Sequence, residues 1–228
     1  MTDDELPVEV IPIRLGPTGR AYLVRQHGVI LVDTGTPGSE ATIIQRMKES
    51  GISPSDIRLI LLTHGHADHA GSARTLRDLT GAPVAIHRDD APLVRSGNQG
   101  PLVPTGIPGM ILGKYFSAKK RSLFPPVDPD ILIGDSFGLH EYGIRGEVIP
   151  TPGHTRGSVS LLLTNGDVIV GDLIMPSIPG GTPAPPFWAE DLSQLIESVR
   201  KVVAFQDGKI YTGHGGPFTA NQVRQHLL

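Results

Sequence analysis

The residues best suited to chemistry lie in one short stretch, His64-Gly65-His66-Ala67-Asp68-His69. It places imidazoles and a carboxylate close together, directly after the apolar run 57–62. That run is short, rich in leucine and β-branched residues, and ends at a polar turn, which predicts a buried strand. Zinc and similar divalent metals prefer imidazole and carboxylate ligands, and the end of a strand is a rigid place from which to aim them. The stretch therefore predicts a metal site.

Three further candidate ligands stand in the same setting, each in a glycine-containing turn just after a short apolar run. They are His154 after 148–149, Asp172 after 168–170 and His214 after 210–211. Because separate strand ends supply these side chains, we expect them to meet at one edge of the predicted sheets. The remaining histidines that lack this setting are interpreted as surface or hydrogen-bonded residues: His27, His87, His140 and His226.

Composition restricts the other possibilities. The chain has 228 residues, of which 39% are hydrophobic and 19% charged, as is usual for a soluble globular enzyme. It contains no cysteine, so nitrogen and oxygen atoms must hold any metal. The net charge of −3 and the lack of a basic block argue against a nucleic-acid partner. No apolar run could span a membrane, and the acidic start at 1–5 does not resemble a secretory signal. We therefore expect a cytoplasmic protein.

The order of predicted elements is typical of an α/β protein. Strands are predicted at 8–13, 21–25, 29–32, 57–62 and 84–87, and helices at 40–49 and 69–79. The second half repeats this layout, with strands at 131–133, 138–142, 147–149, 158–163, 168–170 and 209–212, and helices at 191–205 and 219–228. Strands before helices in each half indicate two packed sheets with helices outside. We expect one domain over 1–228, with a Gly/Pro-rich insertion at about 91–135.

Residues 97–126 of the insertion and a second Gly/Pro-rich stretch, 176–188, are the predicted rims of an open site. Both carry apolar and aromatic side chains, which favour a wall that contacts substrate. The candidate substrate-binding residues are Met110, Tyr115, Phe116, Phe187 and Trp188. The alternatives for the insertion are a dimer contact and a surface loop without a role in the chemistry.

The motif His64-x-His66-x-Asp68-His69, followed by His154, Asp172 and His214, resembles the metallo-β-lactamase superfamily of metallohydrolases. The resemblance covers about 8–216 and implies an αββα four-layer sandwich with a two-metal site. In that family pattern His64, His66 and His154 bind the first metal, Asp68, His69 and His214 bind the second, and Asp172 bridges both. Asp33 matches an aspartate that steadies the ligand loop, and a turn-forming aspartate is the alternative.

The resemblance implies two divalent ions, with zinc favoured and manganese or iron as alternatives. Such a pair lowers the pKa of a shared water, and the resulting hydroxide attacks a small-molecule ester, lactone or thioester. Asp68 is the candidate catalytic residue, because it could also orient the hydroxide or pass on its proton. The partner is therefore expected to be a small molecule, and a homodimer is left open.

Departures from known members narrow the choice. The bridging position holds Asp172 where the β-lactamases generally have cysteine or serine. The chain stops soon after His214, whereas glyoxalase II-type thioesterases add a helical region there. Met175 occupies the position of the tyrosine of acyl-homoserine-lactone lactonases. The alternatives to the hydrolase are a phosphodiesterase on the same scaffold, a mononuclear iron oxidoreductase resembling the persulfide dioxygenases, and a non-catalytic binding module.

Overall fold

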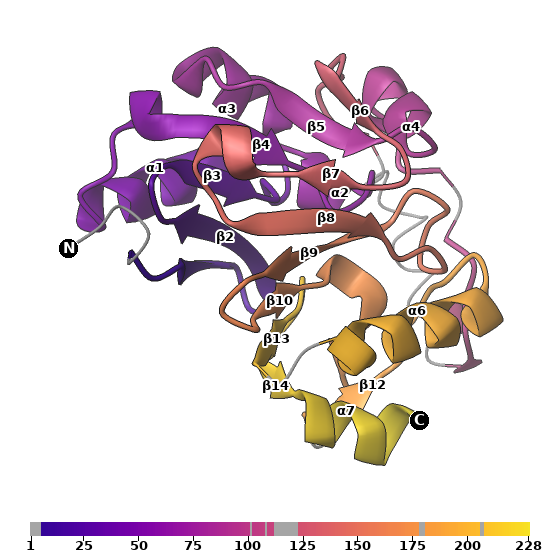
Figure 1. The fold of residues 1–228 in the computed structure, drawn as a ribbon. Helices are drawn as coiled ribbons and strands as arrows, with labels where there is room; N and C mark the ends of the chain where they lie inside the picture. Colours follow the sequence, from indigo (N-terminus) through magenta and orange to yellow (C-terminus); the bar gives the residue numbers. More distant parts are fainter. Residues whose placement is uncertain (1–5, 101, 108, 112–122, 178–180, 206–207) are drawn as a thin grey trace.

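Two six-stranded sheets pack face to face, with helices on both outer sides (Figure 1). The structure is a computed structural model that describes residues 6–100, 102–107, 109–111, 123–177, 181–205 and 208–228. In the part of the chain so described, none of the helices combines the length and apolar character needed to cross a bilayer.

The first sheet has the order β1-β2-β3-β4-β5-β6. Its strands are β1 (Glu9–Leu15), β2 (Gly19–Arg25), β3 (Val29–Val32), β4 (Ile57–Leu61), β5 (Val84–His87) and β6 (Ile131–Ile133). The first three are antiparallel neighbours, whereas β3, β4, β5 and β6 pair in parallel. The carboxyl ends of these parallel strands therefore share one edge of the sheet.

The second sheet has the order β14-β13-β10-β9-β8-β7. Its strands are β7 (Phe137–Gly138), β8 (Gly146–Pro150), β9 (Val159–Leu163), β10 (Val168–Ile169), β13 (Lys209–Tyr211) and β14 (Phe218–Thr219), and β11 (Met175–Pro176) pairs separately with β12 (Pro183–Ala184). β9 is antiparallel to both β8 and β10, and β10 is parallel to β13. β8, β10 and β13 thus run in the same direction and also end at a common edge.

Three apolar layers separate the four layers of secondary structure, which confirms the αββα sandwich. The helices are α1 (Glu40–Glu49), α2 (Ala67–Ala70), α3 (Ala73–Thr80), α4 (Ala91–Ser96), α6 (Leu192–Phe205) and α7 (Ala220–Leu227), with 3₁₀ turns η2 (Pro54–Asp56), η3 (His140–Tyr142) and η4 (Gly171–Leu173). One core lies between α1, α3, α4 and the first sheet, a second between the sheets, and a third beneath α6 and α7. Each sheet is thus buried on both faces, which is why strands such as β3 are apolar throughout.

Two expected elements differ from the structure. The helix predicted at 69–79 is two helices, α2 and α3, separated at Gly71 and Ser72. A Cβ at Gly71 would collide with the Ala67 carbonyl oxygen and with Pro37, so the chain packs too closely there for a regular continuation. The strand predicted at 138–142 is also wrong, because residues 140–142 form η3, which ends at Gly143 in a left-handed conformation (φ 76°).

Candidate metal centre

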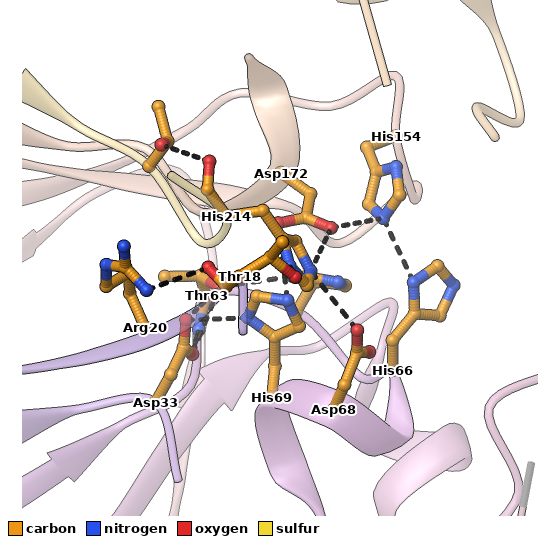
Figure 2. Close-up of polar contacts among 12 residues, drawn as sticks. Thr18, Arg20, Asp33, Thr63, His66, Asp68, His69, His154, Asp172 and His214 are labelled. Atoms are coloured by element: carbon orange, nitrogen blue, oxygen red, sulfur yellow. Dashed lines mark hydrogen bonds and ion pairs between the residues drawn. The ribbon is translucent and has the colours of Figure 1, made fainter. Parts of the chain in front are cut away.

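The predicted ligands meet at the edge where the strands of both sheets end (Figure 2). One sheet contributes the turn after β4, and the other contributes the turns after β8, β10 and β13. The structure groups all of the predicted ligands into three overlapping sets: His64, His66 and His154; His64, His69 and Asp172; and Asp68, His69 and His214. Within each set, the candidate ligand atoms lie within 4.8 Å of one another. The cluster therefore has the size of a metal site.

Asp172 lies next to histidines of all three sets. Its Oδ1 atom lies 3.3 Å from His69 Nε2. Its Oδ2 atom lies 3.4 Å from His214 Nε2 and 3.8 Å from His154 Nε2. Figure 2 shows this carboxylate between His154 and His214. One buried carboxylate thus faces histidines that the family pattern assigns to different metals.

His64 carries a nitrogen that the folded protein leaves without a partner. The Thr63 hydroxyl donates to a carboxylate oxygen of Asp33 at 2.8 Å, so its oxygen can accept from His64 Nδ1, 3.1 Å away. His64 Nε2 then carries a lone pair, and it is buried without a hydrogen-bond partner. An unpaired buried acceptor costs free energy, which a bound cation would offset. The site therefore fits a metal ion.

Other hydrogen bonds orient two more imidazoles in the same way. His69 Nδ1 donates to Asp33 Oδ2 at 2.8 Å, and His154 Nδ1 donates to the carbonyl oxygen of Trp188 at 2.7 Å. Each bond leaves the Nε2 atom of the ring as an electron-pair donor that faces the cluster. Such partners fix the tautomer and the ring orientation of metal-binding histidines.

The electrostatics favour the ligand forms of His64, His66 and Asp172, whereas the neighbouring carboxylates, Asp172 foremost, raise the pKa of His69 and His214. Burial holds the pKa of His64 well below its ordinary value, and burial with the nearby His154 lowers the pKa of His66 to about 3. Burial opposes ionisation of Asp172, but His214 and His69 outweigh it and hold the pKa of this carboxyl below its usual range. Neutral imidazole beside an anionic carboxylate is the donor set that divalent metals require.

Asp33 lies where the sequence places it, beside a candidate ligand. It is buried at the end of β3 and adopts a positive φ of 61°, which is unusual for a residue other than glycine. Its carboxylate accepts from the Thr63 backbone N–H at 2.8 Å, as well as from the Thr63 hydroxyl and His69. These bonds hold the strained conformation and connect Asp33 to the loop that carries His64 and His69.

Sequence reasoning missed Asp90, which connects two of the ligand-bearing loops, those after β4 and β8. This aspartate follows β5 and is 2% exposed. One oxygen accepts from the Gly65 N–H and from the Thr155 hydroxyl, each at 2.8 Å, and the other accepts from the Gly157 N–H at 2.9 Å. Gly65 lies between His64 and His66, and Thr155 adjoins His154. One carboxylate therefore fixes both loops relative to each other.

A sequence signal for Asp90 did exist. Asp90 follows the apolar strand β5 in the same way as the turn that carries His64 follows β4. The strands β4 and β5 are parallel neighbours. Parallel neighbours end at the same sheet edge, so an aspartate there belongs near the cluster. The carboxylate faces backbone N–H groups instead of the candidate ligands, and burial raises its pKa.

The two Gly/Pro-rich segments contact each other beside His154. The Thr105 N–H donates to the Phe187 carbonyl at 3.0 Å, and Trp188 Nε1 donates to the Gly109 carbonyl at 3.2 Å. Since the Trp188 carbonyl also accepts from His154, this wall is connected to the candidate metal site. Met110 lies on the same segment and is 55% exposed. The other two predicted wall residues, Tyr115 and Phe116, lie outside the described residues.

The fold is an αββα sandwich, and its candidate metal ligands, which are histidines and aspartates, lie together where the strands end. A family model described as "Metallo-beta-lactamase superfamily" matches residues 16–214. The chain belongs to this superfamily.

Similar proteins carry related descriptions. The chain is 30% identical to "Probable metallo-hydrolase YflN" of Bacillus subtilis, over 88% of this chain and 80% of that protein. It is 29% identical to "Probable metallo-hydrolase MJ0888" of Methanocaldococcus jannaschii, over 88% and 89% of the two chains. Among solved structures, BLEG-1, a B3 metallo-beta-lactamase, superimposes with a TM-score of 0.71 at 24% identity, covering 96% of this chain and 97% of that one. This last likeness concerns the fold alone.

Proposed function

We propose that this protein is a dinuclear metal-dependent hydrolase of a small ester, lactone or thioester. The observation that carries the proposal is the position of Asp172, which faces His154 on one side and His69 and His214 on the other. A carboxylate so placed can bridge two ions. The superfamily membership and the metallo-hydrolase relatives support hydrolysis in general, and the substrate class is part of the proposal.

In the proposed assignment His64, His66 and His154 hold the first ion, Asp68, His69 and His214 hold the second, and Asp172 contacts both. When bound, the two ions supply a water of lowered pKa and a polarised substrate carbonyl. Zinc is the proposed metal because nitrogen and oxygen ligands of this kind suit it, and manganese and iron are the alternatives.

Asp68 is the proposed catalytic group. Its side chain is 43% exposed, whereas the other members of the cluster are largely buried. Asp68 Oδ2 lies 3.2 Å from His214 Nε2, which holds the carboxylate in place. The carboxylate therefore reaches the open side of the site, where it can accept a proton and pass it to the leaving group.

The proposed partner is an apolar small molecule. The wall formed by the segments around Thr105 and Trp188 adjoins His154 and carries the side chains of Met110, Phe187 and Trp188. Such a wall favours an uncharged acyl group over a polyanion. The cytoplasmic location stays a prediction, and a homodimer is left open.

Metal analysis combined with a substrate panel tests the proposal. We would measure metals in freshly purified protein by elemental mass spectrometry, then assay lactones, thioesters and phosphodiesters before and after chelation. About two zinc or manganese ions per chain, with acyl hydrolysis that chelation removes, is the expected result. Turnover of phosphodiesters alone would favour the phosphodiesterase. About one iron per chain with persulfide-dependent oxygen uptake would favour the oxidoreductase.

Asp68→Asn should impair catalysis and binding of the second ion while sparing the first ion. In the proposed assignment Asp68 is a ligand of the second ion alone. Asp68→Asn should therefore retain the first ion and weaken the second. The loss of a proton-transfer group should lower kcat by about 10²–10⁴-fold. Asp78→Asn, at an exposed site in α3, is the matched control. Equal loss of both ions in Asp68→Asn would contradict the assignment.

A further inference from the structure

A cavity lies over the edge strand β1, beside the turn that follows His214. Its volume is about 510 Å³, which is in the range of small-molecule sites. The walls come from β1, the start of β2, helix α1 and the turn 215–217. None of the candidate metal ligands lines it. This cavity is therefore a separate site from the metal centre.

Two arginines of the cavity stand directly opposite each other. Arg14 on β1 pairs in register with Arg20 on β2. Like charges in such a cross-strand pair repel and destabilise the sheet unless an opposite charge lies nearby. Within the described part of the chain, neither guanidinium forms an ion pair with a carboxylate. The pair thus leaves positive charge uncompensated at the cavity wall.

The position of Arg20 is fixed by the backbone. Its Nη1 atom donates to the carbonyl oxygens of Thr18 at 3.0 Å and Gly19 at 2.9 Å. Those bonds use one nitrogen and leave the other guanidinium donors for a ligand. A guanidinium held in this way loses little conformational freedom when it binds an oxyanion.

Helix α1 adds a third arginine to the same cavity. Arg46 lines it together with Glu49, and their closest charged atoms are 3.6 Å apart. A single glutamate cannot balance three arginines, so the lining is positive overall. An anion is the ligand that this charge distribution favours.

The floor of the cavity is aromatic. Tyr22 and Tyr211 both line it, with ring centroids 5.5 Å apart in an edge-to-face arrangement. The Tyr22 hydroxyl donates to the Thr212 carbonyl oxygen at 2.6 Å, which fixes its ring. A rigid aromatic surface beside arginines suits a ligand with a flat apolar body and an oxyanion at one end.

We propose that this cavity binds a small organic anion, with the oxyanion at the Arg14–Arg20 pair, the ring against Tyr211, and Arg46 adding positive charge to the lining. The occupied site would adjoin the His214 turn, because Gly215 and Gly216 line the cavity and the Arg20 N–H donates to the Gly213 carbonyl oxygen at 2.8 Å. The proposal does not depend on the identity of the hydrolysed substrate.

Calorimetric titration with benzenesulfonate and with sulfate tests the site in the intact, metal-containing protein at constant ionic strength. Benzenesulfonate is a flat anion without a hydrolysable bond. We expect it to bind more tightly than sulfate, because sulfate lacks the ring. Arg14→Gln should weaken benzenesulfonate binding about tenfold, since it removes one charged contact, and Arg46→Gln should weaken it less, since it removes only a nearby charge.

Lys48→Gln is the matched control. It removes the same charge from an exposed position of α1 that does not line the cavity, and it should leave the affinity unchanged. Absence of benzenesulfonate binding to the wild-type protein would overturn the proposal. Equal affinity in the wild type and in both arginine variants would also overturn it, because the anion would then bind elsewhere. Sulfate affinity as high as that of benzenesulfonate would exclude the aromatic contact.

Discussion

Asp172→Asn is expected to lose metal from both sides of the centre and to remove nearly all hydrolytic activity. An amide offers one neutral oxygen where the carboxylate offers two charged ones, and those two oxygens face His69, His154 and His214. Substituting residues that merely support a ligand weakens metal binding about 10–100-fold. We expect a larger loss here, because Asp172 is itself a proposed ligand of both ions.

Competition with a chromophoric chelator would measure this loss for each ion, and Asp78→Asn again serves as the control for an exposed aspartate. Asp172→Asn and Asp68→Asn should differ in a definite way. The first should release both ions, whereas the second should retain one. An Asp172→Asn protein that still binds two ions with unchanged affinity would show that this carboxylate does not bridge them.

Asp90→Ala is expected to have the second largest effect, although Asp90 is not in any of the candidate ligand sets. The substitution leaves the Gly65 and Gly157 N–H groups buried without their acceptor. Each such group costs about 1–3 kcal/mol, so the free energy of unfolding should fall by about 2–6 kcal/mol. Because the two ligand loops would no longer be fixed to each other, metal affinity should fall about 10–100-fold.

Two further variants separate positioning from general destabilisation. Asp90→Asn keeps the shape but directs an amide NH₂ toward an N–H donor, so its metal affinity should lie between those of wild type and Asp90→Ala. Asp89→Asn changes the exposed neighbour and should behave as wild type. The visible spectrum of the cobalt-substituted protein, recorded well below the melting temperature, should change in the Asp90 variants. An unchanged spectrum and unchanged metal affinity would restrict Asp90 to a stabilising role.

The sequence predicted most of the fold because its strands are short apolar runs that end at polar or glycine-containing turns. The run before His64 is the clearest example, and the strand-end positions of His154, Asp172 and His214 follow the same rule. Of the two errors, the strand expected at 138–142 is replaced in part by a 3₁₀ turn that ends at a left-handed glycine, and the helix expected at 69–79 is divided by tertiary packing. The approach of Gly71 to Pro37 divides a helix whose side-chain periodicity is continuous.

Other features could not be predicted, for different physical reasons. The position of Asp90 after β5 indicates a place near the cluster, but its partners lie in loops that are distant in the sequence, and no local pattern specifies them. The cavity beside Arg14 depends on the register of β1 and β2, which places Arg14 opposite Arg20. Register also depends on the turn between the two strands, so residue types alone do not determine it. The contact between the Gly/Pro-rich segments likewise could not be predicted from the sequence, because neither segment has the apolar periodicity of a helix or a strand.

The distribution of the candidate ligands between the two sheets has a consequence for the whole molecule. His64, His66, Asp68 and His69 come from the first sheet, and His154, Asp172 and His214 come from the second. Bound ions would therefore act as a cross-link between the halves of a chain that has no cysteine. By mass action, each tenfold excess of metal over its dissociation constant would stabilise the folded chain by about 1.4 kcal/mol. Metal supply, instead of redox state, would then set how long the enzyme survives in its folded form.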